Sequence, residues 1–347
     1  MISSSLNQDK VEDEFIFKST SSWLFLPFSI TRRSSGTVMR DLKEKSTDCR
    51  AYSEAKSLRA GLLFAVVGTA LFGLKAIFIK LAYKEGVDAT TLLTLRLLIA
   101  LPFYCGVLLW LVFKENKPLP QGKDIPTIFV LGFIGYYLSA YLDMEGLTYI
   151  STQLERLTLY TYPLMTTLLG WLLFKEVISK RVIIALLLTY SGVLLLYWFE
   201  ASEVGSDATK GVLLVLTAAF TFACYMTFSN LYIVQIGSLL FTAIAMLSSI
   251  GYMLVHFFWT HELADLNQST TILGYGFLLA IFSTVIPSFM MAEAIARIGP
   301  SRSSIVGTAG PIFTIGLAVL VLDEPFGLTH FGGMVLVIMG VSMLGKK

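Results

Sequence analysis

The sequence predicts an all-α polytopic membrane protein, with ten transmembrane helices arranged as two inverted five-helix repeats. Three observations lead to this fold class. The 347-residue chain is 55% hydrophobic and only 14% charged, with a mean hydropathy of +0.72, whereas a soluble chain carries roughly 25% charged residues. The second half of the sequence repeats the first at a spacing of 148 residues. Lysine and arginine gather at alternate ends of successive apolar segments.

Apolar segments of sufficient length define the expected spans, because a helix needs about 20 apolar residues to cross a bilayer. Several segments are interrupted by Gly or Pro, and the joins near residues 150 and 299 are short. The ten segments are 60–83, 89–113, 125–149, 152–174, 179–199, 210–232, 238–260, 272–297, 300–322 and 328–345. Spans one to five form repeat one, residues 58–199, and spans six to ten form repeat two, residues 208–347.

The repeat is clearest near the end of each copy, where a proline, an acid and a glycine recur without a gap. The aligned pairs are Pro163 with Pro311, Glu176 with Glu324, and Gly192 with Gly340. Because each copy holds an odd number of spans, the copies must face opposite ways across the membrane. Inverted repeats of this kind build many secondary transporters.

The distribution of basic residues predicts the orientation. With a cytoplasmic N-terminus, twelve lysines and arginines flank the inner ends of the spans, and only Lys84 and Lys210 lie in outer loops. Cytoplasmic loops are enriched in these residues, so we expect a multi-pass protein of the cell (inner) membrane with both termini cytoplasmic. Four tryptophans would then lie at the two membrane interfaces: Trp110, Trp171, Trp198 and Trp259.

The first 57 residues differ from the rest, being rich in Ser, Lys, Arg, Asp and Glu. The apolar patch at 23–30 is far too short to span a bilayer, and no signal-peptide pattern is present. We expect a disordered cytoplasmic tail over residues 1–57. Translation from Met39 is an alternative, under which residues 1–38 would not be part of the protein.

Several functional classes are disfavoured by composition and motifs. A net charge of +2 gives no reason to expect nucleic-acid binding, and the three cysteines are scattered, which indicates neither a disulfide framework nor a metal site. The sequence holds no phosphate-binding loop, zinc-protease motif or nucleophile elbow. We therefore expect no enzyme activity, no cofactor and no bound metal.

Charged residues inside the spans are the candidate substrate-binding or translocation residues, because a charge at the bilayer centre costs about 2.5–3.5 kcal/mol on insertion scales. Lys75 is the deepest, within about one helical turn of the midplane of its span. The candidates are Lys75, Arg96, Glu145, Glu155, Arg156 and Glu293. Asp143 also lies near the outer end of span three, two residues before Glu145.

Repeat two serves as an internal control, because it builds the same helices without most of these charges. The repeat-two partners of Lys75, Arg96, Asp143, Glu155 and Arg156 are Ala223, Ile244, Met291, Ser303 and Ser304. Only Glu145 keeps its type, as Glu293. We infer a polar cluster specific to repeat one, with ion pairs that join Arg96 or Arg156 to Glu145 or Glu155.

Four of the candidates also have a structural alternative. Arg96 would serve packing between helices, and Glu155 with Arg156 would form a pair at the headgroups. Glu293 and Arg297 would form a simple pair one turn apart. Pro163 and Pro311, the predicted helix-break positions, free backbone carbonyls in mid-span and mark bending points for alternating access. A purely structural kink is the alternative.

The residues resemble the EamA-type branch of the drug/metabolite transporter superfamily. The resemblance rests on LFGLKAIFIKLAY at 71–83, on TLRLLIALP at 94–102, and on the proline, acid and glycine at the end of each copy. It covers residues 60–347. It implies a central cavity formed mainly by spans one, three, four, six, eight and nine. This chain departs from the family's small or weakly polar residues at Lys75, Glu155 and Arg156.

Together these features predict a secondary transporter of a small polar or amphipathic metabolite, and specifically an exporter that works by alternating access. Lys75, with Arg96 or Arg156, would meet an anionic group such as a carboxylate, and Glu145, Glu155 or Glu293 would carry a coupling proton. The expected partners are a small-molecule substrate and the lipid bilayer, with a homodimer left open. The alternatives are a non-transporting scaffold or sensor, and a passive channel.

Overall fold

Helices account for all regular secondary structure in the described part of the chain. The computed structural model describes residues 35–344, apart from residues 121, 176–178 and 308, and no strand occurs among them. The all-helical fold predicted from the sequence is therefore confirmed. The packing described below belongs to Glu54–Lys347, which forms a compact unit.

Seven of the described helices are long and apolar enough to cross a bilayer. They are Leu58–Lys84, Ala89–Lys114, Ile125–Gly146, Lys180–Ser202, Ser206–Ser229, Ser238–Thr260 and Thr270–Met291, and the shorter apolar helices are Gly310–Leu322 and Leu328–Met343. The elements in chain order are α1 (Ser35–Lys84), α2 (Ala89–Leu109), η1 (Trp110–Lys114), α3 (Ile125–Gly132), η2 (Phe133–Leu138), α4 (Ser139–Gly146), α5 (Thr152–Leu159), α6 (Tyr162–Phe174), α7 (Lys180–Val204), α8 (Ser206–Ile236), α9 (Ser238–Thr260), η3 (Leu263–Leu266), α10 (Thr270–Ala280), η4 (Ile281–Val285), α11 (Ile286–Gly307), α12 (Gly310–Leu322) and α13 (Leu328–Leu344).

The helix α1 begins earlier than the sequence predicted. Residues 35–57 were expected to be disordered, but they are helical from Ser35 onward. This segment is rich in Lys, Glu, Ala and Arg, which favour helix. Extending the helix of the first span also avoids the cost of nucleating a new one. Residues 1–34, including the apolar patch at 23–30, lie outside the described residues.

The two short joins behave differently from each other. Near residue 150, the chain leaves α4 after Gly146 and enters α5 at Thr152. The prediction that one span ends and the next begins near residue 299 is wrong, because α11 continues from Ile286 to Gly307. A proline removes one backbone hydrogen bond from a helix, and membrane helices tolerate this where neighbouring groups satisfy the backbone. Pro300 therefore did not mark a boundary.

Pro163 and Pro311 each lie in the first turn of a new helix, immediately after a break. The chain leaves α5 at Leu159 and enters α6 at Tyr162. It leaves α11 at Gly307 and enters α12 at Gly310. Proline suits a first turn because the N–H that it lacks would have no partner within the helix. The expected spans four and nine are thus each interrupted.

The backbone repeats its conformation at the 148-residue spacing. The bounds of α6 and α12 differ by 148 residues at both ends, as do the starts of η2 and η4 and the starts of α7 and α13. The residues that follow α6 and α12, Lys175 and Asp323, both adopt the left-handed conformation with φ of 56°. Non-glycine residues rarely adopt it, so its recurrence at matched positions indicates a shared backbone path.

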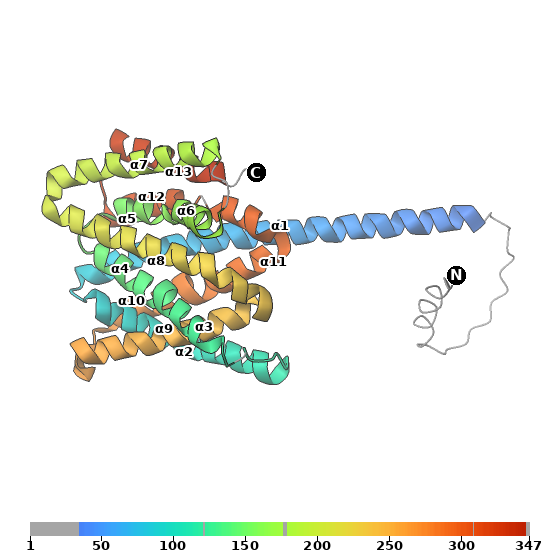
Figure 1. The fold of residues 1–347 in the computed structure, drawn as a ribbon, viewed down its shortest axis with the longest axis horizontal. Helices are drawn as coiled ribbons and strands as arrows, with labels where there is room; N and C mark the ends of the chain where they lie inside the picture. The colour runs from blue at the N-terminus through green and yellow to red at the C-terminus, as the bar shows by residue number, and fades with distance from the viewer. Residues whose placement is uncertain (1–34, 121, 176–178, 308, 345–347) are drawn as a thin grey trace. The chain divides into compact units, whose positions relative to one another are not determined.

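The helices α7 and α13, which close the two copies, lie side by side (Figure 1). A Cβ atom on Gly192 would lie 2.7 Å from Gly333 O, and one on Gly340 would lie 2.8 Å from Ala185 O. Glycine thus permits the close backbone approach typical of membrane helix pairs. The shift relates Gly192 to Gly340 and Ala185 to Gly333, so one contact becomes the other when the copies are exchanged.

Candidate functional site

Lys75 and Asp143 form an ion pair between α1 and α4. The Nζ atom of Lys75 lies 2.5 Å from Oδ2 of Asp143, and the two side chains are 15% and 3% exposed. Charge-assisted hydrogen bonds are short and strong. The pair offsets part of the cost of placing a charge in the membrane interior. Lys75 is therefore not extended toward a helix end but is held inside the bundle.

Glu155 and Arg156 on α5 join this pair, and both are buried. The Glu155 carboxyl lies within hydrogen-bonding reach of the Asp143 carboxyl. The Arg156 guanidinium interacts electrostatically with both acids and lies 5.3 Å from the centre of the Tyr160 ring. We call Lys75, Asp143, Glu155 and Arg156 the central charge cluster.

Arg96 reaches toward the cluster from α2 and is 8% exposed. Its Nε donates to Thr284 Oγ1 at 2.8 Å, and that hydroxyl donates to Leu279 O, five residues earlier, across η4. Arg96 also interacts electrostatically with Asp143. The π-helical turn in the second copy thus supports a cation from the first.

Four buried polar atoms in this region have no hydrogen-bond partner among the described residues. They are Arg96 Nη1, Asp143 Oδ1, Glu155 Oε2 and Arg156 Nε. Buried polar groups in native proteins are nearly always satisfied. The two guanidinium donors, Arg96 Nη1 and Arg156 Nε, give this buried region the capacity to bind a polar molecule.

Glu145 and Glu293 lie apart from the cluster. Glu145 accepts a hydrogen bond from the Tyr149 hydroxyl at 3.2 Å. Glu293 pairs with Arg297 at 2.6 Å, one helical turn away, and both side chains are more than one-third exposed. Of the residues predicted from the sequence, Lys75, Glu155 and Arg156 are brought together, with Arg96 close by.

Asp143, the counter-ion of Lys75, is not among the site residues predicted from the sequence. A signal existed, since repeat two replaces both members of the pair, with Ala223 and Met291. Asp143 and Glu145 are two residues apart, which places them about 200° apart around a helix. The choice between them depends on helix rotation, which the sequence does not specify.

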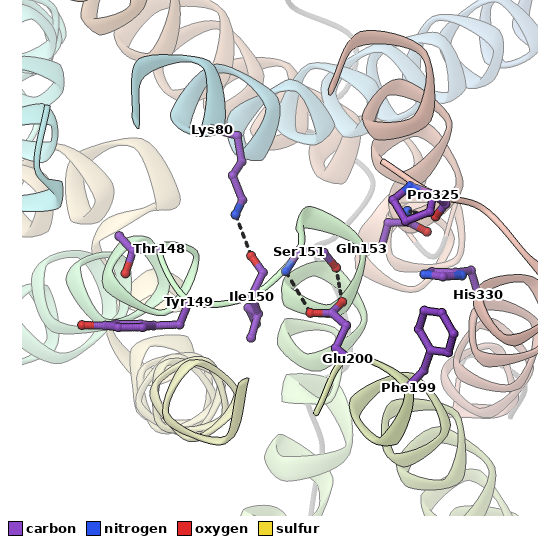
Figure 2. Close-up of a pocket in the computed structure, with 10 residues that line it drawn as sticks. All are labelled: Lys80, Thr148, Tyr149, Ile150, Ser151, Gln153, Phe199, Glu200, Pro325 and His330. Carbon is purple, nitrogen blue, oxygen red and sulfur yellow. Dashed lines mark hydrogen bonds between the residues drawn. The ribbon is translucent and has the colours of Figure 1, made fainter. Parts of the chain in front are cut away.

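A cavity of about 270 Å³ lies one to two turns farther along α1 (Figure 2). Lys80 reaches from α1 and donates to Ile150 O at 2.7 Å. Ser151, Gln153, Glu200 and His330 also line the cavity, and Gln153 Oε1 is buried without a partner among the described groups. Lys80 interacts electrostatically with Glu155, so the cavity adjoins the central charge cluster.

Two carboxylates cap the N-terminus of α5. Glu200 accepts from the backbone N–H and the hydroxyl of Ser151, as Figure 2 shows. Glu324 accepts from the backbone N–H of Thr152 at 2.9 Å and of Gln153 at 3.3 Å. Negative charge is favourable at a helix N-terminus. These contacts anchor the short helix that carries Glu155 and Arg156.

The two helix breaks contact each other. The Tyr160 hydroxyl, in the break between α5 and α6, donates to Gly307 O at 2.7 Å, beside the break between α11 and α12. A Cβ atom on Gly310 would collide with the Tyr160 hydroxyl. The breaks therefore meet in the interior, and Pro163 and Pro311 each lie within a few residues of this contact.

An all-helical chain with several membrane-spanning helices and a buried charge cluster has the characteristics of a membrane transporter. The sequence matches the EamA-like transporter family over residues 59–198 and 209–345. The chain therefore belongs to that family, which confirms the resemblance inferred from its motifs. Both matched segments are of the same family, one in each copy.

The names of two similar proteins also describe them as transporters. The chain is 30% identical over 311 residues to the uncharacterized transporter YcbK of Bacillus subtilis, covering 85% of this chain and 98% of that one. It is 28% identical over 250 residues to the uncharacterized transporter YetK of the same organism, covering 70% and 75%. The family and these relatives identify a multi-pass membrane transporter rather than an enzyme.

A solved crystal structure shares the fold, with a TM-score of 0.59 and 14% sequence identity. The match covers 82% of this chain and 96% of the other. Among the described residues, no group of three or more His, Cys, Asp or Glu side chains is placed to hold a metal ion.

Proposed function

We propose that the protein is a secondary transporter that exports a small polar or amphipathic metabolite by alternating access. The observation that carries the proposal is the buried central charge cluster. Its four charged side chains occupy α1, α4 and α5, and their equivalents in repeat two are uncharged. The fold does not need them in both copies, which supports a role in binding substrate.

The proposed architecture is a ten-helix inverted repeat, with repeat one at residues 58–199 and repeat two at residues 208–347. The shared bounds of α6 and α12, and the exchange of glycine contacts between α7 and α13, support it. In this architecture, α5 and α6 together form span four, and the end of α11 together with α12 forms span nine. The contact between the two breaks then lies where the copies would move against each other.

Both termini are proposed to be cytoplasmic in the cell (inner) membrane. The excess of lysine and arginine on one side supports this orientation. Trp110 and Trp171, expected at the inner interface, and Trp198 and Trp259, expected at the outer interface, are all exposed. Tryptophan that faces the membrane–water boundary is typical of membrane proteins.

In the proposed mechanism, Lys75 binds an anionic group of the substrate, with Arg96 or Arg156 as the second cation. The coupling proton resides on a carboxyl group of the same region. Among the acids considered from the sequence, Glu155 has the geometry for this role, since Glu145 and Glu293 lie outside the cluster. Release of Lys75 from Asp143 would free its ammonium group for the substrate.

The test is counterflow into reconstituted vesicles, with metabolites that raise the melting temperature of the purified protein. Lys75→Met should abolish saturable flux while the protein remains folded. Lys84→Met, at the exposed end of the same helix, is the matched control and should retain flux. Equal flux in Lys75→Met and wild type would contradict the assignment. A scaffold would show no flux of any solute, and a channel would show neither saturation nor counterflow.

A further inference from the structure

The contact between Asp143 and Glu155 requires a proton. Their side chains are 2% and 1% exposed by residue, and the two carboxyl groups lie within hydrogen-bonding reach of each other. An ionised carboxylate can only accept hydrogen bonds, and two adjacent carboxylates cannot both remain ionised without a large repulsion. Lys75 already occupies Oδ2 of Asp143. One proton held between the two acids satisfies this geometry.

Charged groups approach this pair from several elements. The cations that interact with it are Lys75 and Lys80 on α1, Arg96 on α2 and Arg156 on α5. Glu200 on α7 and Glu324 after α12 interact with Lys80, and Glu145 lies two residues after Asp143 on α4. Tyr83 donates to Met144 O, and Tyr160 to Gly307 O. His330 on α13 lines the adjoining cavity.

Several titratable groups on neighbouring elements bind other partners. On α8, Lys210 donates to Tyr149 and Tyr225 donates to Tyr136. On α11, Glu293 pairs with Arg297, and α12 contains no titratable residue. The cations that interact electrostatically with the pair are thus Lys75, Lys80, Arg96 and Arg156.

A proton held by the pair adds one positive charge to this region. An added charge within the membrane interior is costly, and an anion bound at Lys75 would offset it. A protonated Glu155 that donates to Asp143 also shares the negative charge that holds Lys75, which favours release of the ammonium group to bind that anion. Proton binding and anion binding therefore favour each other, and this coupling is reciprocal.

We propose that Asp143 and Glu155 hold a single proton between them, and that this proton binds together with an anionic substrate and crosses the membrane in the same direction. The inference rests on the transport function proposed above and specifies its substrate class and its coupling. The proton is taken from water on one side and released on the other, and no bond of the substrate changes. Export would then be driven by the substrate's own concentration gradient.

The proton pair is tested by infrared spectroscopy of the purified full-length protein across the pH range in which it stays folded. Wild type should show the carbonyl band of a protonated carboxyl group. Asp143→Asn and Glu155→Gln should each remove the whole band, because the pair holds one proton. Glu293→Gln should leave it unchanged. Absence of the band from wild type, which needs no variant to fold, would overturn the proposal, as would its persistence in Glu155→Gln.

The coupling is tested by calorimetric titration with three carboxylate probes, lactate, benzoate and succinate. Affinity for a bound probe should fall about tenfold per pH unit on the alkaline side, as expected for linkage to one proton, and Glu155→Gln should abolish this dependence. Affinity that is independent of pH, or rises with it, would overturn the coupling. Failure of all three probes to bind would count against the anionic substrate, while the infrared result would still decide the proton pair.

Discussion

At the scale of single residues, burial separates the charges of this chain into two groups. Asp143, Glu155 and Arg156 are each less than one-tenth exposed, whereas Glu293 and Arg297 are 48% and 36% exposed by side chain. Buried charges need partners and lose much when one is removed. Exposed pairs gain little because solvent screens them. The two groups should therefore respond very differently to substitution.

Glu293→Gln is expected to have almost no effect. An exposed ion pair one helical turn apart contributes roughly 0.3–0.5 kcal/mol, and often nothing measurable. The melting temperature in detergent and the saturable flux in vesicles should both stay close to wild type. Glu155→Gln, which removes a buried acid of the central charge cluster, is the comparison variant. A loss of flux in Glu293→Gln as large as that in Lys75→Met would place Glu293 in the translocation pathway.

The residue-level content of the site was partly accessible from the sequence. Comparing the copies singled out Lys75, Glu155 and Arg156, because the second copy lacks their charges. The ion-pair partner of Lys75 could not be predicted from the sequence. Asp143 and Glu145 are both near enough in the chain to be candidates, and they occupy different faces of the same helix. The capping of α5 by Glu200 could not be predicted either, because it depends on the C-terminal part of α7 lying beside the start of α5.

At the scale of elements, short helices and breaks place the site. The eight-residue α5 carries two cluster residues, and carboxylates from two other parts of the chain cap it. The turns η2 and η4 occur at matched positions of the two copies, and η4 supports Arg96 through Thr284. Single π-helical turns within α-helices frequently occur at functional sites.

Gly340→Ala should destabilise the pairing of α7 with α13. Its new methyl group would meet Ala185 O at 2.8 Å and the Thr189 side chain, and overpacking of this kind typically costs about 1–3 kcal/mol. Gly316→Ala is the matched control, because its Cβ would meet nothing within 4 Å. That change should be neutral or stabilise by about 0.4–1 kcal/mol through the unfolded state.

Thermal unfolding of the two glycine variants in one detergent distinguishes these effects. A lower melting temperature for Gly340→Ala alone is expected. Equal behaviour of the two variants would show that the close approach of α7 and α13 does not limit stability.

Element existence was easier to predict than element boundaries. Long apolar segments define helices because the bilayer leaves few alternatives. The helix boundary predicted at residue 299 is not observed, because α11 continues to Gly307. A Gly-Pro pair favours a boundary but does not require one. The prediction of a disordered tail is not met over residues 35–57, because helix-forming residues there extend α1 beyond its apolar span.

At the scale of the whole molecule, the relation between the copies is the main feature. Backbone conformation and helix contacts recur at the same spacing as the sequence repeat. The charge cluster does not recur. A scaffold that repeats its backbone conformation thus carries a charge cluster in one copy only, and the proposed inverted arrangement of the copies has a direct test.

Lys175 and Asp323 occupy matched left-handed positions at the ends of α6 and α12, and both are exposed. In a chain whose native cysteines are replaced, Lys175→Cys should react with a membrane-impermeant thiol reagent only from the cytoplasmic side. Asp323→Cys should react only from the opposite side. Labelling of intact cells and of inverted membrane vesicles measures this difference. Reaction of both positions from one side would exclude the inverted repeat.

The repeat and the charge bias made the class of the whole molecule accessible from the sequence, and the family match confirmed it. The way in which the copies pack was not accessible. Sequence spacing shows that Gly192 and Gly340 correspond, but it does not show that each packs against the other copy. Such contacts follow from three-dimensional packing of distant segments.

Two glycine contacts join α7 to α13. Each contact is made by one position of the first copy and one position of the second, and the 148-residue shift converts one contact into the other. A substitution in one copy alters one contact directly, and its counterpart stays intact unless the matched position also changes. The position of Lys75 and the matched position of Ala223 do not share a contact of this kind. Lys75 pairs with Asp143, whereas Ala223 carries no charge. After duplication, one copy of such a chain is therefore free to gain a charged site, while the glycines between the copies are held in place by packing.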